Sequence, residues 1–334
     1  MTTDVQGAGS ASRPATAPLE ETSGGLQIRN ILCPVDFTEF SDEAFRYAQN
    51  LAWHFKARLL LHHTVSVPRN LLMGTMDVGV MESAYQAELQ TERGKLAALA
   101  ASAELDKEQI ATSFSEGEPI TNILEIIKTQ RIDLVVLGTH GHKGFNHLVL
   151  GSVAEHVIHE AVCPVLVVSK PRPGQTRFRS PRAFEPFPLR TILLATDFSP
   201  SSDRALTYAL RWASEWGGKV VVFHAVEKVP AITQGRVDLF PEYNPAFEEQ
   251  IARAWEQMRR LIPESAQRSC EVLFEVRHGQ PKEEILRVAE EKNADLIVTG
   301  ARGAGKGTSL WGSNSSAVVR AARFPVLVVR QLPG

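Results

Sequence analysis

Two stretches decide the fold, ILCPVDFT at residues 31–38 and ILLATDFS at residues 192–199. Each is an apolar run typical of a buried strand, and each ends in Asp, Phe and a hydroxyl residue. They lie 161 residues apart (192 minus 31), and other matches follow in the same order at this distance or one residue more. These matches pair Gly117-Glu118-Pro119 with Gly279-Gln280-Pro281, Gly151-Ser152 with Gly312-Ser313, and residues 164–168 with 325–329. Matches this long and ordered indicate an internal duplication.

Within each copy, apolar β-branched runs alternate with helical patterns. The first copy predicts strands at 29–35, 58–65, 109–115, 133–138 and 164–169, and helices at 41–55, 80–103, 119–130 and 152–161. Nearly continuous apolar strands separated by helices indicate a parallel sheet that is buried on both faces. The predicted fold class is therefore α/β, with two tandem open parallel five-stranded sheets and helices on both faces.

Composition divides the chain into four segments. Residues 1–26 are small and polar, which predicts a disordered tail and excludes a secretory signal. The first domain is expected at 27–169 and the second at 189–331. Residues 170–188 between them are rich in Pro and Arg and are interpreted as a linker.

The charge and cysteine content exclude several classes of protein. The 334 residues include 36 basic and 38 acidic residues, a balance that predicts neither a nucleic-acid partner nor a membrane contact. No apolar run approaches the roughly 18 residues of a spanning helix. The three cysteines, an odd number without CxxC spacing, argue against a disulfide framework and a zinc site. We expect a cytoplasmic protein.

A glycine-rich loop follows the fourth predicted strand of the first copy. Gly138 and Gly141 open it, and Gly151-Ser152 close it where the next helix is expected to begin. Free backbone N–H groups and the positive end of a helix dipole suit a phosphate, and Lys143 adds charge. Ser152 is expected to be the N-cap of that helix. The alternative is an ordinary connection, for which this loop is long.

These features together resemble the universal stress protein family, whose ATP-binding members carry a G-x2-G-x9-G-(S/T) loop. The matching positions are Gly138, Gly141, Gly151 and Ser152 in the loop, residues 34–38 around the Asp after the first strand, and His63-Thr64 in the turn after the second. The resemblance covers both copies. It implies a Rossmann-like fold of the adenine-nucleotide alpha-hydrolase type, with ATP, with or without Mg²⁺, as cofactor.

The resemblance also implies which residues of the first copy bind the nucleotide. The set is Pro34, Val35, Asp36, Thr64, Leu137, Gly138, Gly141, Gly151, Ser152 and Val153. Asp36 would accept hydrogen bonds from the adenosine, and Thr64 would line the adenine pocket through its backbone. Asp36 could instead cap the following helix, but Ser41 and Asp42 lie closer to the predicted helix start, which leaves Asp36 for the ligand.

The second copy keeps most of this set but departs from the loop spacing. The corresponding positions are Asp197, Ala225, Gly300, Gly303, Gly312 and Ser313. Only eight residues separate Gly303 from Gly312, where the first copy has nine between Gly141 and Gly151. The shorter loop either tightens the phosphate cradle or closes it.

Two other interpretations of the sequence compete with this one. Residues 300–309, GARGAGKGTS, fit the P-loop of a nucleotide kinase, but the next helix is expected only after Gly312. His156 and His159 are spaced to share a metal, although solvated side chains are the simpler interpretation. No GxSxG nucleophile elbow is present. We assign no catalytic and no metal-binding residues.

The sequence thus predicts an ATP-binding tandem universal stress protein that acts as a nucleotide-responsive regulatory factor. At most it would hydrolyse ATP slowly, because no general base or metal carboxylate is evident. The resemblance implies that domains pair through their last strands, giving a homodimer or an intramolecular pseudo-dimer, with an unidentified protein partner. A scaffold of the same fold without nucleotide binding is the alternative.

Overall fold

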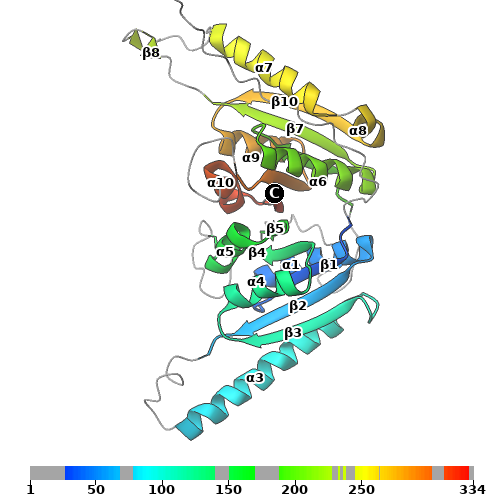
Figure 1. Cartoon of the computed structure of the whole chain (residues 1–334), viewed down its shortest axis with the longest axis vertical. Helices are drawn as coiled ribbons and strands as arrows, with labels where there is room; N and C mark the ends of the chain where they lie inside the picture. The colour runs from blue at the N-terminus through cyan, green and yellow to red at the C-terminus, as the bar shows by residue number, and fades with distance from the viewer. Residues whose placement is uncertain are drawn as a thin grey trace, which may run out of the picture.

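The computed structural model describes residues 27–67, 78–139, 150–169, 188–227, 232–233, 236–237, 245–262, 264–302 and 312–330. The predicted tail, most of the linker, and the loop residues Gly141, Lys143 and Gly303 lie outside these ranges. Within the described residues, strands and helices alternate along both copies (Figure 1). No described helix is both long enough and apolar enough to cross a membrane.

The first copy has the order of elements that its sequence predicts. They are β1 (Asn30–Pro34), α1 (Glu39–Phe55), β2 (Arg58–Val65), α3 (Val78–Ala101), β3 (Ile110–Glu116), α4 (Pro119–Thr129), β4 (Leu134–Gly138), α5 (Ser152–Glu160) and β5 (Val165–Val168). Every boundary lies within two residues of the prediction.

The second copy repeats this order, and its described residues also include the paired strands β8 and β9 and the short helix α8. Its elements are β6 (Thr191–Ala195), α6 (Pro200–Trp216), β7 (Lys219–Val226), β8 (Ile232–Thr233), β9 (Arg236–Val237), α7 (Pro245–Leu261), α8 (Glu264–Ser269), β10 (Glu271–His278), α9 (Pro281–Glu291), β11 (Leu296–Gly300), α10 (Ser313–Ala321) and β12 (Val326–Val329).

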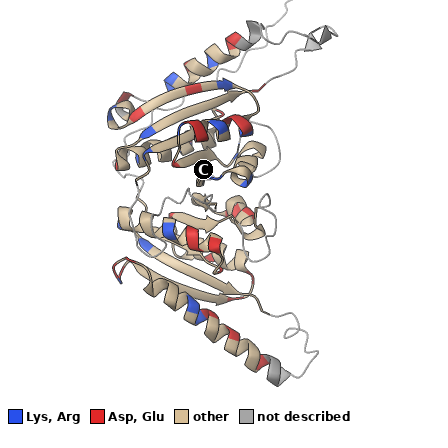
Figure 2. Cartoon of the chain, turned by 180° about the vertical axis from the view of Figure 1, so that it is seen from behind, with Lys and Arg blue, Asp and Glu red and all other residues tan. Residues whose placement is uncertain are grey.

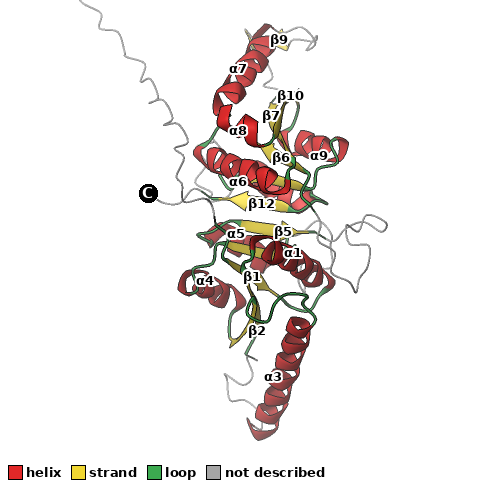
Figure 3. Cartoon of the chain, turned by 90° about the vertical axis from the view of Figure 1, so that its right-hand side faces the viewer, coloured by secondary structure: helices red, strands yellow, loops and turns green. Residues whose placement is uncertain are grey.

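The two parallel five-stranded sheets are the halves of one ten-stranded sheet. The strand order is β10-β7-β6-β11-β12-β5-β4-β1-β2-β3, and only β12 and β5 pair antiparallel. Figure 3 shows β5 and β12 side by side at this junction, where Leu166 lies opposite Leu327. The α/β fold class is confirmed. The last strands of the two copies, through which the family resemblance predicts pairing, form the junction within a single chain.

Alternating strand residues build one hydrophobic core on each face of the sheet. Ile31 and Cys33 of β1 pack with α1 on one face, whereas Leu32 packs with α4 and α5 on the other. Both cores continue into the second copy, where α6 covers the first face and α9 and α10 cover the second. Side chains of successive strand residues point to opposite faces, so every β1 residue in this run is buried.

The charged residues lie around this apolar centre. Figure 2 shows both signs of charge on the helices of both copies, as the near-neutral formal charge of −2 suggests. Many neighbours in a helix pair at i, i+4, as Arg253 does with Glu249 and Arg260 with Glu256. Such exposed pairs add only tenths of a kcal/mol each (~0.3–0.5) to stability.

The first helix of the first copy begins earlier than the sequence predicts. Thr38 caps α1, its Oγ1 accepting a hydrogen bond from the Ser41 N–H, so the helix begins at Glu39 rather than at residue 41. Ser199 caps α6 in the same way. Ser and Thr are both good caps, and the choice between Thr38 and Ser41 is made by the backbone, which is extended at Thr38.

Candidate functional site

The candidate site lies where the strand order of the first copy reverses. β1 pairs with β2 on one side and with β4 on the other, all parallel, so the loops after β1 and β4 leave the same edge of the sheet. Ile31 aligns with Leu134 and Leu32 with Val135. Ligands of open parallel sheets bind at such a point, beyond the carboxyl ends of the strands.

Gly138 ends β4 in close contact with the start of α1. A Cβ at this position would lie 2.7 Å from the carbonyl oxygen of Phe40. Only glycine lets the end of β4 pass this close to the backbone of the helix. The same packing recurs at Gly300, whose added Cβ would lie 2.9 Å from the backbone nitrogen of Ser202.

The loop after β4 returns to the sheet at the start of α5. Thr139 N donates to the Val168 carbonyl (3.1 Å), and Gly151 N donates to the Thr139 carbonyl (2.8 Å). Our assignment of Ser152 as the N-cap is wrong: Gly151 is the cap and Ser152 is the first helical residue. Because Gly151 has no side chain to accept a hydrogen bond, the first amide groups of α5 receive none from the side chain of the capping residue.

Asp36 follows β1 and is half-buried. Its Oδ1 accepts hydrogen bonds from the backbone N–H of Thr38 (3.2 Å) and from Thr38 Oγ1 (2.6 Å). The argument that a helix start at Ser41 leaves Asp36 uninvolved is therefore wrong, because Thr38 both caps the helix and holds the carboxylate. One carboxylate oxygen is fixed by Thr38, which sets the orientation of the group.

His63 holds the end of β1 against β2. Its Nδ1 lies 2.7 Å from the Val35 carbonyl oxygen, and its ring packs 4.6 Å from the ring of Phe37. The ring is buried, and Nε2 lies 3.6 Å from a Glu92 carboxylate oxygen. His63 and Thr64 lie in the last residues of β2, not in a turn after it. The histidine therefore positions the backbone next to Asp36.

The other predicted residues of the first copy lie around this point. Pro34 ends β1, and Val35 is buried just beyond it. The Leu137 side chain is buried in the core, so only its backbone is available to a ligand. Ser152 is exposed, and Val153 packs against the core. Except for Gly141, which is not described, the predicted set surrounds the ends of β1, β2 and β4.

The second copy repeats the framework of the site. His224 Nδ1 lies 2.8 Å from the Thr196 carbonyl oxygen, and the His224 ring packs 4.5 Å from Phe198. Asp197 Oδ1 accepts from the Ser199 N–H at 3.1 Å. Gly312 caps α10 without a side-chain hydrogen bond, Ser313 begins that helix, and Ala225 lies near the end of β7.

A group of serines distinguishes the second copy from the first. Ser199 Oγ (3.1 Å) and Ser201 Oγ both donate to the Arg302 carbonyl, a contact that we call the serine bridge. Ser202 Oγ donates to Asp197 Oδ1. In the first copy, Phe40 stands at the position of Ser201. The bridge ties the start of the glycine loop directly to the N-terminus of α6.

A second buried histidine, His62, precedes His63 in β2. His62 lies inside the sheet, with Nδ1 3.2 Å from Ser113 Oγ and Nε2 2.8 Å from Thr64 Oγ1. Burial lowers the pKa of His62 to about 4, with a smaller contribution from His63. Among the described residues, no group of three or more His, Cys, Asp or Glu side chains could hold a metal ion.

The P-loop-like stretch and the pair His156 and His159 have simpler structural explanations. Most of the P-loop-like stretch lies outside the described residues, but the helix after it begins at Ser313, later than a P-loop helix would. His156 Nδ1 lies 2.8 Å from the Ser152 carbonyl oxygen of its own helix. Burial lowers the pKa of His159. These contacts account for His156 within the helix.

The comparisons with known proteins agree with this architecture. The model of the universal stress protein family matches residues 27–169 and again residues 188–330. The chain belongs to the universal stress protein family. The two matches show that its universal stress protein domains are in tandem.

Individual members of the universal stress protein family match either the whole chain or one half. One from Mycolicibacterium smegmatis is 29% identical over 314 residues, covering 90% of this chain and 96% of that one. Another, from Methanocaldococcus jannaschii, is 37% identical over 146 residues, covering 43% of this chain and 84% of that one. A crystal structure from Archaeoglobus fulgidus has a TM-score of 0.62 at 22% identity, covering 92% of this chain and 98% of that one. That structure supports the fold alone.

Sequence reasoning missed the serine bridge of the second copy. Ser199, Ser201 and Ser202 resemble an ordinary helix start, and nothing in one sequence shows that two of them reach the Arg302 carbonyl. Aligning the two copies gives one sequence signal for this contact. Phe40 and Ser201 are equivalent but different residues, and each packs against the glycine that ends a strand, Gly138 or Gly300. A difference between the copies at such a close contact points to a difference in the loop.

Proposed function

We propose that this universal stress protein binds ATP, with or without Mg²⁺, at the site of its first copy. The observation that carries the proposal is that Asp36 and the start of α5, whose cap Gly151 has no side chain, flank the switch point between β1 and β4. A carboxylate on one side and the first amides of a helix on the other match the two ends of a nucleotide. The Asp36 carboxylate would accept from the ribose or the adenine amino group, and the α5 amides would bind phosphate.

The residues present fit this ligand. Gly151 contributes no side chain at the helix start, so an anion can approach the first amide groups of α5. Thr64 lies at the end of β2, where its backbone would border the base. Mg²⁺, where present, would be carried by the phosphates of the nucleotide. ATP, when bound, would supply the negative charge to which this end of the sheet responds.

We propose a regulatory role in place of turnover. Asp36 Oδ1 is already held by Thr38, and His63 is held by the Val35 carbonyl. In this proposal both groups position the ligand. A protein partner in the cytoplasm would respond to the nucleotide-bound state, and a homodimer of the whole chain is a further part of this proposal.

Calorimetric titration of the full chain with ATP tests the proposal. Gly151→Glu places a carboxylate where the phosphate would bind, and we expect it to weaken ATP binding by tenfold or more, about 1.4 kcal/mol. Gly151→Ala is the matched control, because the backbone at Gly151 (φ −62°, ψ 143°) is open to any residue. The control should retain affinity within about threefold, or about 0.6 kcal/mol.

A scaffold without nucleotide binding is the second candidate function, and the serine bridge favours it for the second copy. The bridge joins the two loops between which a nucleotide would enter. If the wild-type chain shows neither binding heat nor a rise in melting temperature at millimolar ATP, the scaffold is the better description of both copies. Binding of one ATP per chain would limit the scaffold role to the second copy.

A further inference from the structure

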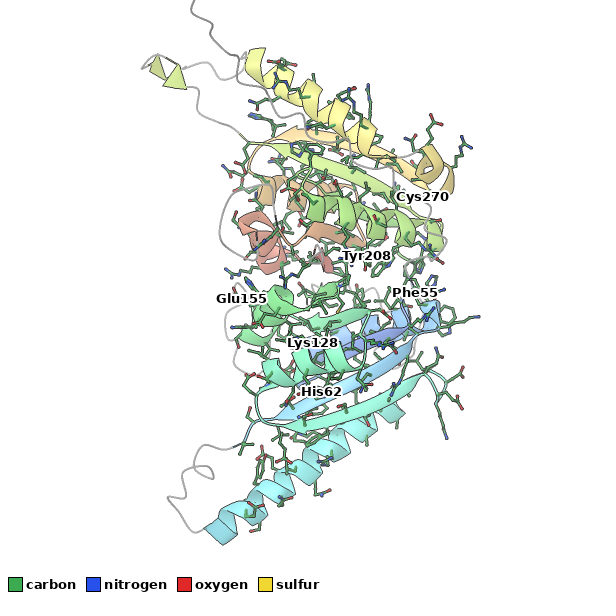
Figure 4. The ribbon with its side chains drawn as sticks, viewed as in Figure 1. Phe55, His62, Lys128, Glu155, Tyr208 and Cys270 are labelled. Carbon is green, nitrogen blue, oxygen red and sulfur yellow. The ribbon has the colours of Figure 1, made fainter. Side chains whose placement is uncertain are left out.

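The helices that begin at the two candidate sites, α5 and α10, face each other across the junction between the copies. The 161-residue repeat makes Glu155 of α5 the equivalent of Ser316 of α10, and His159 the equivalent of Arg320. Ser169 corresponds in the same way to Arg330. Figure 4 shows Glu155 where α5 lies beneath α10. Three equivalent positions therefore carry different charges in the two copies.

Two arginines of the second copy hold both ends of α5. Arg320 Nη2 donates to Glu155 Oε1 at 2.6 Å, in the first turn of the helix. Arg330 Nη1 donates to the carbonyls of His159 and Ala161 at the other end of the helix. We call Arg320 and Arg330 the arginine clamp. The arginine clamp thus extends from the second universal stress protein domain to α5, the helix that begins at the candidate site of the first.

The reverse contact is weaker. Ser169 Oγ donates to the Ala322 carbonyl at 2.9 Å, which is the equivalent of the Arg330 contact but with a neutral donor. Ser316 stands where the first copy has Glu155, so α10 offers no carboxylate at this position. The second copy therefore holds α5 with two cations, whereas Ser169 of the first copy reaches the carbonyl after α10 with a neutral hydroxyl.

We propose that the arginine clamp of the second copy sets the nucleotide affinity of the first copy. This inference rests on the proposed function of the first site. Glu155 lies one turn beyond Gly151, so its negative charge opposes a phosphate at the helix start, and Arg320 neutralises it. Arg330 places a cation at the carbonyl end of α5. It interacts favourably there with the negative end of the helix dipole, whose positive end attracts the phosphate. Both arginines are positioning residues, since they act through α5.

The coupling works in both directions. If Arg320 favours a phosphate at α5, bound phosphate favours the Arg320–Glu155 contact by the same factor. Nucleotide binding in the first copy would therefore tighten the contact between the copies. Both side chains are partly exposed, 42% for Arg320 and 35% for Glu155. The expected coupling is about threefold to fivefold, the upper range for such a pair.

A double-mutant cycle on the full chain tests the inference, with ATP affinity as the readout. Arg320→Ala should weaken ATP binding about threefold to fivefold, and Glu155→Gln should leave it unchanged or tighter. In the Glu155→Gln background, Arg320→Ala should have no further effect, because the charge that it neutralised is gone. Arg211→Ala, which breaks the Arg211–Glu215 pair on α6, is the matched control and should leave affinity unchanged.

Three further readouts separate this electrostatic role from a structural one. The effect of Arg320→Ala should be larger for ATP than for AMP, and it should shrink as salt is raised. Arg320→Lys should restore affinity to within about twofold, because it keeps the charge. Circular dichroism of each variant confirms that it is folded. Arg330→Ser, which installs the first copy's residue, should weaken ATP binding in the same direction.

The possible results decide between the inference and the function on which it rests. If the wild-type chain binds ATP and Arg320→Ala binds it equally well, the inference fails and the proposed function stands. If Arg320→Ala weakens binding equally in the wild-type and the Glu155→Gln backgrounds, Arg320 does not act through Glu155 and the inference also fails. Absence of ATP binding by the wild type overturns both.

Discussion

The two copies share the framework of their sites and differ in the side chains between the helix start and the glycine-rich loop. In each, a histidine ring bonds to the backbone carbonyl before the aspartate, and a glycine caps the helix that follows the loop. In the second copy, serines bridge the two loops, and in the first copy no serine stands at the Phe40 position. The histidine contact and the glycine cap occur in both copies, whereas the serine bridge is found in the second copy. The duplication therefore contains its own internal control.

The largest expected effect concerns the junction, where the copies should behave alike. Leu166 and Leu327 are equivalent, lie opposite each other and are fully buried. Each Leu→Ala change should lower the free energy of unfolding by about 2–5 kcal/mol. Leu273 on the outer strand β10 is 38% exposed, and its change to Ala should cost well under half as much. Urea denaturation measures all three, and unequal losses at Leu166 and Leu327 would contradict a symmetric junction.

His62 is a second difference, because Phe223 occupies the equivalent position. The folded pKa of His62, about 4, lies below the ordinary 6.5, so the unfolded chain binds more protons between these values. The stability contributed by neutral His62 is complete above pH 6.5 and is lost as the pH falls towards 4, by about 3 kcal/mol. His62→Phe should therefore flatten the fall in unfolding free energy over this window.

The slope, not the absolute stability, is the readout for His62. The variant also loses the hydrogen bonds to Ser113 and Thr64, which lowers stability at every pH. His54, His159 and His224, whose pKa values are also lowered, are present in both proteins and cancel in the difference. An unchanged slope would mean that His62 is accessible to protons in the folded protein.

The two aspartates should differ in their effect on ligand binding. Asp36→Ala should weaken ATP binding by about tenfold to a hundredfold, the equivalent of a lost hydrogen bond to a charged group. Asp197→Ala should leave the main binding event unchanged, because the serine bridge joins the two loops between which a nucleotide would enter the second copy. Calorimetry of the two variants gives the comparison. Equal losses of ATP affinity in the two variants would show that both copies bind nucleotide and that the serine bridge does not block the second site.

The smallest effect is expected at the serine bridge. Ser201→Ala removes the hydroxyl that donates to the Arg302 carbonyl and should cost about 1 kcal/mol of stability. Ser41→Ala in the first copy, which removes a bond to the Thr38 carbonyl within one helix, is the control. Hydrogen exchange at the residues after β11 measures the local consequence. Exchange should rise there in Ser201→Ala and stay at the wild-type rate in the control.

Much of the fold follows from the sequence because its features are local or repeated. The apolar run before Asp36 and its copy before Asp197 identify the first strand twice, and every first-copy boundary is within two residues of its prediction. The joining of the two half-sheets into one is harder to predict from the sequence. The VLVV runs of β5 and β12 are apolar on both faces and do not indicate which strand each pairs with. The family resemblance supplied that pairing.

The site is less predictable than the fold because its decisive contacts join distant residues. Thr38 holding Asp36 is local and follows from capping rules once the helix start is known. The contact of Arg320 with Glu155 joins residues on different copies, and charges of opposite sign are common on helices. Nothing in the spacing of either residue indicates the other. The binding of nucleotide by the predicted residues stays a prediction.

The position of β5 at the centre of the sheet has a consequence for synthesis of the chain. β5 completes the first copy, but its partner β12 is made only after the rest of the second copy. Until then, the apolar strand Val165–Val168 ends the half-sheet as an open edge. An open apolar edge pairs readily with another chain, and domains made first fold first. Two nascent chains close together would therefore join through β5, giving the same antiparallel contact between chains that the finished protein makes within one.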